Sequence, residues 1–174
     1  MSSSLDHLND LASFIEASPS SFHAVAEAAR RLTAAGFTEL RESDDWPDAP
    51  DKRGHPGKRT ERGKNGAPTR RFVVRDGAII AWICPKIAGP TTPFRIVGTH
   101  TDSPGFALKP KPTIGSCGWL QAGVEVYGGP LLNSWLDREL ELAGRLVFID
   151  GSIALVRTGP FLRFAQLAVH LDRE

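Results

Sequence analysis

Two residues with metal-binding chemistry, His100 and Asp102, lie two positions apart in the segment 94–105. A neutral imidazole can donate a lone pair to a metal ion, and a nearby carboxylate can reach the other ring nitrogen or orient a neighbouring group. The apolar run 94–97 predicts a buried strand that ends just before His100. Sites in open α/β sheets form at the carboxyl ends of strands. The pattern therefore indicates a metal ligand at His100, with a structural histidine as the alternative.

Four motifs follow one another along the chain: Ser18-Pro-Ser-Ser-Phe-His23, Gly98-Thr-His-Thr-Asp-Ser-Pro104, the segment 124–145 with its Tyr-Gly-Gly and Trp-Leu-Asp-Arg sequences, and Leu167-Ala-Val-His-Leu171. In their content and order, these motifs resemble those of the aspartyl aminopeptidase family of metallopeptidases. The similarity extends from about residue 9 to the last residue. The resemblance therefore covers nearly the whole chain.

The resemblance implies an enzyme that removes acidic residues from the N-termini of peptides by attack of metal-activated water. His100 matches a metal-ligand histidine of the family, and Asp102 matches the catalytic-site aspartate that orients the site. His170 matches a histidine that one subunit presents to the substrate pocket of its dimer partner. Taken without the resemblance, His170 would be a residue on the polar side of a short helix.

The same resemblance implies two Zn²⁺ ions per complete site, other divalent ions being possible, and a homo-oligomer built from dimers. The expected substrates are peptides with N-terminal Asp or Glu. In the family, the bridging aspartate, the glutamate base and the remaining ligands lie well downstream of the matched part. We therefore expect a catalytically incomplete N-terminal portion of the enzyme. The alternative is a non-catalytic β-rich interaction module that keeps a dimer surface and uses no metal.

Composition sets broad limits on these functions. The chain has 174 residues, 41% hydrophobic and 24% charged, with a formal net charge of +1. These values are typical of a soluble globular protein and give no reason to expect nucleic acid or membrane as a partner. Cys84 and Cys117 lie far apart and match no zinc-site spacing, which favours a reduced, cytoplasmic setting. We expect no signal peptide and no membrane span.

The N-terminal half predicts two helices and a small sheet. Helical spacing indicates helices over 5–16 and from Ser20 or Ser21 to about residue 35. A short strand is expected at 37–40, and a hairpin pairs 71–75 with 78–84 around an Asp-Gly turn. The intervening segment 44–70 is rich in Gly, Pro and basic residues, which predicts a mobile polar loop. His23 is not expected to bind metal, because the sequence offers no acidic residue or second histidine at ligand spacing from it. His55, next to Pro56 in the polar loop, is likewise not expected to be a ligand.

The C-terminal half predicts mainly strands. We expect them at 106–110, 119–127, 143–149 and 153–157, with a helix over 160–173. The resulting fold class is α/β. Residues 1–104 are expected to form the N-terminal part of an α/β metallopeptidase catalytic domain, and 105–174 part of a β-rich dimerisation domain.

Overall fold

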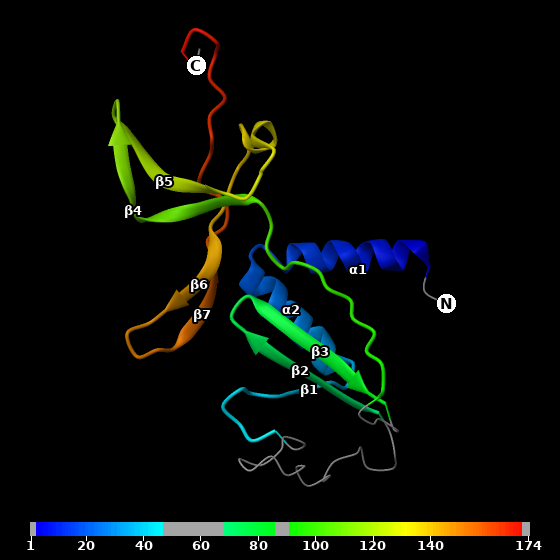
Figure 1. Cartoon of the computed structure of the whole chain (residues 1–174). Coiled ribbons are helices and arrows are strands. Elements are labelled where there is room, and N and C mark those ends of the chain that lie inside the picture. Colours follow the sequence, from blue (N-terminus) through cyan, green and yellow to red (C-terminus); the bar gives the residue numbers. More distant parts are fainter. Residues whose placement is uncertain (1–2, 47–67, 86–90, 172–174) are drawn as a thin grey trace. The chain divides into compact units, whose positions relative to one another are not determined.

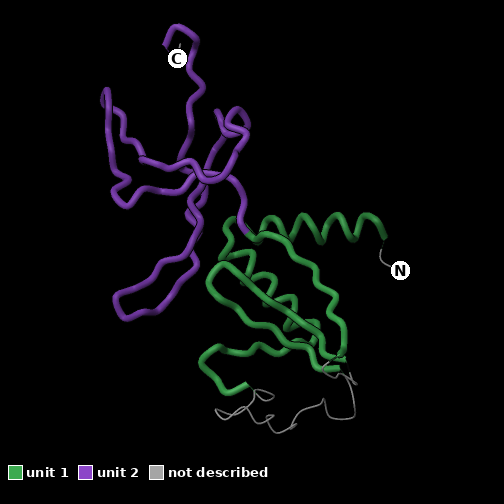
Figure 2. Tube along the Cα trace, viewed as in Figure 1, with its two compact units in different colours: residues 1–101 green, residues 102–174 purple. Residues whose placement is uncertain are grey.

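The computed structural model describes residues 3–46, 68–85 and 91–171. The chain divides into two compact units, residues 1–101 and 102–174 (Figure 2). The first unit contains helices and a sheet, and the second contains paired strands and a short 3-10 helix (Figure 1). This mixture of helices and strands confirms the predicted class. The assignment of the two units to a catalytic and a dimerisation domain stays a prediction.

Two helices form where the sequence predicts them, α1 (Ser4–Glu16) and α2 (Ser21–Ala34). Ser3 caps α1 through its side chain, and Asp6 completes a capping box by accepting from the backbone nitrogen of Ser3. Ser20 caps α2 by accepting from the backbone nitrogen of His23. The side-chain oxygen of Ser20 also lies 2.8 Å from Nδ1 of His23. His23 therefore has a local structural contact at the start of α2.

The sheet of unit 1 has the strand order β1-β2-β3, with β1 (Thr38–Glu39), β2 (Thr69–Arg75) and β3 (Ala78–Cys84). β2 and β3 form the antiparallel hairpin that the Asp-Gly sequence predicts. Asp76 in the turn has a φ of 52°, a left-handed conformation that Asp tolerates better than most residues. β1 pairs with β2 in parallel. The sheet is therefore built from one local pairing and one distant pairing.

The core of unit 1 lies between α2 and this sheet (Figure 1). Phe72 is fully buried and Val25 is 2% exposed. Ala24 and Val73 are the other buried hydrophobic residues among those that the structure describes. Phe72 and Val73 are neighbours on β2, so their side chains point to opposite faces of the sheet. The α2 side of the sheet is held by a small number of apolar side chains.

The predicted strand over 94–97 is wrong. Residues 92–100 have no regular structure, and Phe94, Ile96 and Val97 are 89%, 85% and 95% exposed. A strand needs a neighbour to satisfy its backbone groups. Within the described ranges, no strand pairs with this segment. The segment has the apolar composition of a strand, but among the described residues it forms no backbone hydrogen bonds with a neighbouring strand.

Unit 2 is built on two hairpins (Figure 1). β4 (Gly105–Ser116) pairs with β5 (Trp119–Tyr127), with an irregularity in register between Leu108 and Thr113. β6 (Ala143–Val147) pairs with β7 (Ile153–Arg157) around the predicted Asp-Gly turn. These pairings confirm the four strands expected from the sequence, β4 being longer than expected and β6 shorter.

Aromatic side chains join the remaining segments of unit 2. The short 3-10 helix η1 (Leu132–Trp135) places the Trp135 ring edge-on to Phe106, with ring centroids 5.1 Å apart. The Phe164 ring also packs on Phe106, with ring centroids 4.5 Å apart. Isolated bridges pair Leu162 with Leu140 and Phe164 with Leu136. This cluster holds the 160–166 segment in an extended conformation.

The predicted helix over 160–173 is therefore wrong for residues 160–171, and 172–173 lie outside the described residues. Its leucine and alanine spacing fits a helix, but Leu162 and Phe164 alternate as in a strand and reach their contacts only when extended. Tertiary contact has overridden the local helical pattern.

The predicted polar loop over 44–70 lies mostly outside the described residues, as does His55. At its edges, β2 already begins at Thr69, and the ring of Trp46 lies 5.9 Å from that of Trp82. In the described part of the chain, neither helix has the length and hydropathy needed to cross a membrane.

Candidate functional site

His100 lies at the end of the irregular segment that closes unit 1. Its side chain is exposed, and the residue after it is fixed to the sheet. Thr101 is half-buried and donates its hydroxyl to the carbonyl oxygen of Gly77 in the β2–β3 turn. A side chain at Gly77 would place its Cβ 2.8 Å from Oγ of Ser21, so this turn lies close against the start of α2. The backbone beside His100 is thus attached to the β2–β3 turn of unit 1.

Asp102 is the first residue of unit 2, and Tyr127 at the end of β5 binds it. The Tyr127 hydroxyl donates to Oδ2 of Asp102 at 2.6 Å. This hydrogen bond, followed by the charge of Asp102 and by desolvation, raises the pKa of Tyr127 above its ordinary value of 10.0. The phenol therefore stays protonated as a donor across the physiological pH range.

The turn after Asp102 is enclosed by residues of the Tyr-Gly-Gly and Trp-Leu-Asp-Arg motifs. The β4–β5 ladder begins with the pair Gly105–Tyr127. A Cβ added at Gly128, whose φ is +71°, would lie 3.4 Å from Pro104 Cβ. Another added at Gly105 would lie 3.4 Å from Cη2 of Trp135. The glycines at this turn thus allow three chain segments to approach closely.

Asp137 connects the Trp-Leu-Asp-Arg motif to the segment that leads to His170. Its backbone nitrogen donates to the carbonyl oxygen of Phe164 at 2.8 Å, and its Oδ1 accepts from the backbone nitrogen of Gln166 at 3.1 Å. Its φ of 53° is left-handed. His170 follows in an exposed turn at 169–171, closed by a hydrogen bond from the Leu171 nitrogen to the Ala168 carbonyl oxygen. Two hydrogen bonds of one residue therefore hold the segment that precedes His170.

The donor types at His100 and Asp102 fit zinc, which binds imidazole nitrogen and carboxylate oxygen. A catalytic zinc is held by three protein ligands and a water molecule. Over 3–46, 68–85 and 91–171, the structure groups no three His, Cys, Asp or Glu side chains in the manner of a metal site. His100, with Asp102 beside it in the sequence, therefore offers part of a zinc coordination shell. The roles of His100, Asp102 and His170 stay predictions.

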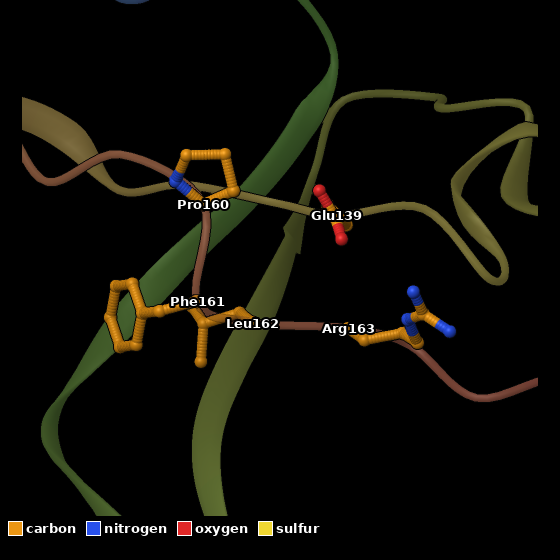
Figure 3. Close-up of a pocket in the computed structure, with 5 residues that line it drawn as sticks. All are labelled: Glu139, Pro160, Phe161, Leu162 and Arg163. Carbon is orange, nitrogen blue, oxygen red and sulfur yellow. The ribbon is translucent and has the colours of Figure 1, made fainter.

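A shallow hollow of about 280 Å³ lies elsewhere in unit 2. It is lined by Glu139, Pro160, Phe161, Leu162 and Arg163. Figure 3 shows the Glu139 and Arg163 side chains on two neighbouring backbone segments, with the Phe161 ring turned away from them. None of the residues predicted to carry the chemistry lines this hollow.

Tyr127 is the residue that sequence reasoning missed. A usable signal was present, because Ser103-Pro104-Gly105 and Tyr127-Gly128-Gly129 both mark strand ends. If those ends belong to paired strands, Tyr127 lies beside Asp102. The pairing itself follows from the β4–β5 register.

Comparison with known proteins places the chain in a family. Residues 14–174 match the family described as Aminopeptidase I zinc metalloprotease (M18). The probable M18 family aminopeptidase 2 of Streptomyces avermitilis is 54% identical over 168 residues, which are 96% of this chain and 35% of that protein. The protein of the same description from Mycobacterium bovis is 44% identical over 94% of this chain and 35% of its own length. The chain thus spans about a third of the length of these relatives.

Solved structures agree with this result. The cryo-EM structure of the Ape4 and Nbr1 complex contains a chain that is 38% identical, with a TM-score of 0.75 over 94% of this chain and 30% of that one. The yeast mApe1 dodecamer is 26% identical, with a TM-score of 0.71 over 95% and 36% of the respective chains. These similarities confirm the family that the four motifs indicate: the chain belongs to the M18 aminopeptidases, the aminopeptidase I zinc metalloproteases.

Proposed function

We propose that this chain forms the N-terminal part of a zinc aminopeptidase that removes Asp and Glu from the N-termini of peptides. The observation that carries the proposal is the family match over residues 14–174, which includes His100 and Asp102 in one motif. A complete site, which we propose to hold two zinc ions, would gain from them a Lewis acid and a means to activate water for attack on the peptide carbonyl. This chain contributes one ligand and the groups that hold it.

His100 would hold the metal through one ring nitrogen, which requires the neutral imidazole. Asp102 would orient the site, as carboxylates beside metal-bound histidines do. Thr101 attaches the backbone between them to the β2–β3 turn through the Gly77 carbonyl oxygen. The Thr101 hydrogen bond gives the backbone beside His100 a defined support before metal binds.

His170 would act on the substrate of a partner subunit. Imidazole can donate a hydrogen bond to a peptide or to the oxygen that gains charge in the transition state. The hydrogen bonds from Asp137 to the 164–166 segment support such a role, because they restrict the chain that presents His170. The dodecameric assembly of yeast mApe1 supports a homo-oligomer, which we propose to be built from dimers and to work in the cytoplasm.

The isolated 174-residue chain should bind Zn²⁺ only weakly and should have no peptidase activity of its own. One imidazole with one nearby carboxylate leaves most of the coordination shell to water. Calorimetry with Zn²⁺ tests this directly. Stoichiometric binding tighter than about micromolar that survives His100→Ala would show that the ligand is another residue.

The activity is tested in a chimera that joins this chain to the downstream part of the Streptomyces avermitilis relative, which is 54% identical over the shared region. The chimera should release Asp or Glu from peptide N-termini faster than Leu, and His100→Ala should abolish both zinc retention and turnover. His170→Phe should keep the zinc and lose most of the activity. Preferred release of Leu would contradict the acidic specificity, and full activity of His100→Ala would contradict the site.

Mixing the two inactive chimera variants tests the cross-subunit role of His170. A mixed dimer contains one pocket with an intact His100 and an intact His170 from its partner, so part of the activity should return. Mass spectrometry of differently tagged subunits shows whether mixed dimers form. If they form and no activity returns, His170 does not serve the neighbouring site.

A non-catalytic β-rich interaction module remains the second candidate. The observation that favours it is the tip of the β4–β5 hairpin, where Trp119 and Leu120 are 73% and 93% exposed. Large exposed apolar groups mark contact surfaces. Under this function, the chimera would assemble without zinc and would have no activity.

A further inference from the structure

Tyr127 is the one tyrosine in the sequence, and its hydroxyl binds the aspartate of the metal-site motif. The distance of 2.6 Å between the hydroxyl and Oδ2 of Asp102 is that of a charge-assisted O–H···O bond, the stronger class of hydrogen bond. Both residues are exposed, so water competes for the same carboxylate. A donor placed by the fold keeps the contact without ordering a water molecule.

The position of Tyr127 is set by the backbone around it. It ends β5 opposite Gly105, the first residue of β4, so the ladder fixes its distance from the chain that begins at Asp102. The next residue, Gly128, lies against Pro104, and Trp135 packs against Gly105. Three contacts at the same turn thus fix the register that brings the phenol to the carboxylate.

The carboxylate of an aspartate rotates easily about its last bond, because that torsion has only broad energy minima. Residues 102 and 103 belong to no helix or strand, so their backbone adds little restriction of its own. A hydrogen bond from a side chain on a paired strand restricts the rotation. Partners of this kind around metal-binding histidines orient the ligand, and their loss typically weakens metal binding about 10–100-fold.

We propose that Tyr127 is a positioning residue of the proposed metal-site motif: its hydroxyl fixes the rotation of the carboxylate of Asp102, the aspartate that follows the candidate ligand His100 in the sequence. The inference rests on the proposed function, because it assumes that His100 binds zinc. It assigns a role to the Tyr-Gly-Gly motif. The tyrosine holds the carboxylate, and the glycine after it allows the turn at Pro104 to approach.

The test is an NMR titration of the 174-residue chain with Zn²⁺, following the ring signals of His100. Tyr127→Phe removes only the hydroxyl. Because there is one tyrosine, incorporation of fluorotyrosine changes this residue alone and keeps the donor. Ser116→Ala is the matched control, since it removes a hydroxyl at the far end of the same hairpin. His100→Ala tests the ligand itself.

Tyr127→Phe should weaken zinc binding at His100 by about tenfold at unchanged melting temperature. The fluorotyrosine chain and Ser116→Ala should bind zinc as the unchanged chain does. Equal affinity in Tyr127→Phe and the unchanged chain, with binding lost in His100→Ala, overturns the role of Tyr127 and leaves the proposed function standing. An equal loss in Ser116→Ala, or a lower melting temperature in Tyr127→Phe, makes the effect structural and overturns the role as well. Zinc binding that is absent, or that ignores His100→Ala, overturns the proposed ligand and the inference together.

Discussion

Glu27 on α2 accepts hydrogen bonds from two arginines, Arg30 and Arg31, at the same time. Arg30 donates to both carboxylate oxygens at 2.6 Å, and Arg31 donates through Nε at 2.7 Å. The hydrogen bonds from Arg30 and then Arg31 lower the pKa of Glu27 from 4.5 to about 2. Arg31 also binds Asp10 of α1 at 2.7 Å. A single cluster of charges thus connects the two helices.

The lowered pKa of Glu27 predicts a specific pH dependence of stability. A carboxyl group with a lower pKa in the folded state stabilises the fold fully above its ordinary pKa of 4.5, and this contribution is lost as the pH falls toward 2. Glu27→Gln should lower the melting temperature at neutral pH and make it depend less on pH over that window. Thermal melts of Glu27→Gln and of the exposed control Glu39→Gln check this. Equal pH profiles for Glu27→Gln and the unchanged chain would contradict it.

The Tyr127–Asp102 hydrogen bond predicts a second titration. The hydrogen bond to Asp102, and then its charge, raise the pKa of Tyr127 above 10.0, so the phenol donates this bond below pH 10.0 and loses its proton as the pH rises through the raised pKa. Asp102→Asn removes the negative charge and should return the phenol pKa toward 10.0. The ultraviolet absorbance of the phenolate measures the pKa of Tyr127 alone, since no second tyrosine is present in the sequence. An unchanged titration in Asp102→Asn would show that the bond does not form in solution.

At the scale of elements, local patterns predicted local structure. Helix α2 and hairpin β2–β3 involve residues close in sequence, so caps, periodicity and the Asp-Gly turn are sufficient signals. The segment 94–97 has a strand composition but pairs with no strand of the described residues, and the extended course of 162–164 depends on contacts with Phe106 and its neighbours. Periodicity within one segment does not contain such distant contacts.

The candidate site divides in the same way. The sequence alone shows the spacing of His100 and Asp102 and the position of Ser103-Pro104-Gly105 after them. The bond from Tyr127 depends on the register of β4 against β5, and a shift of one residue would turn that side chain to the other face of the hairpin. Sequence reasoning therefore indicated the candidate ligand His100 and missed Tyr127, the side chain that binds Asp102.

The position of Phe72 on β2 predicts a large effect on stability. Its side chain is fully buried, so Phe72→Ala leaves a cavity and should reduce the free energy of unfolding by about 3–5 kcal/mol. Phe94→Ala is the matched control, because Phe94 is 89% exposed and its loss should change the free energy by less than about 0.5 kcal/mol. Urea unfolding of the two variants measures the difference. Similar losses would show that the 92–100 segment packs in solution.

At the scale of the whole molecule, more apolar side chains of the described residues are exposed than are buried. Among the described residues, Ala24, Val25, Phe72 and Val73 are the buried hydrophobic residues. By contrast, α1 carries a stripe of apolar side chains, Leu5, Leu8, Leu11 and Ile15, each at least 55% exposed. Such a stripe normally faces a partner. Association of the chain is the expected result.

Size-exclusion chromatography should therefore show species larger than a monomer. Replacing Leu8 and Leu11 by Glu should shift the chain toward the monomer, because charged side chains oppose burial of the stripe. The control Asn9→Glu adds charge to the same helix beside the stripe and should change the elution less. A sharply monomeric chain that melts cooperatively would contradict this expectation and would argue for a complete, self-sufficient domain.

The sheet of unit 1 combines an antiparallel pairing of neighbouring strands with a parallel pairing of distant strands, and these two pairings should form at different times. β2 and β3 meet through a tight turn, and such hairpins form within about 1–10 μs. The parallel β1–β2 pairing joins Thr38 to Arg71 and must close a much longer loop, at an entropic cost that is recovered only when α2 packs. The hairpins β2–β3, β4–β5 and β6–β7 should thus precede β1 in time. Thr101, which precedes Asp102 and follows His100, then binds the carbonyl oxygen of Gly77 in a β2–β3 turn that has already formed.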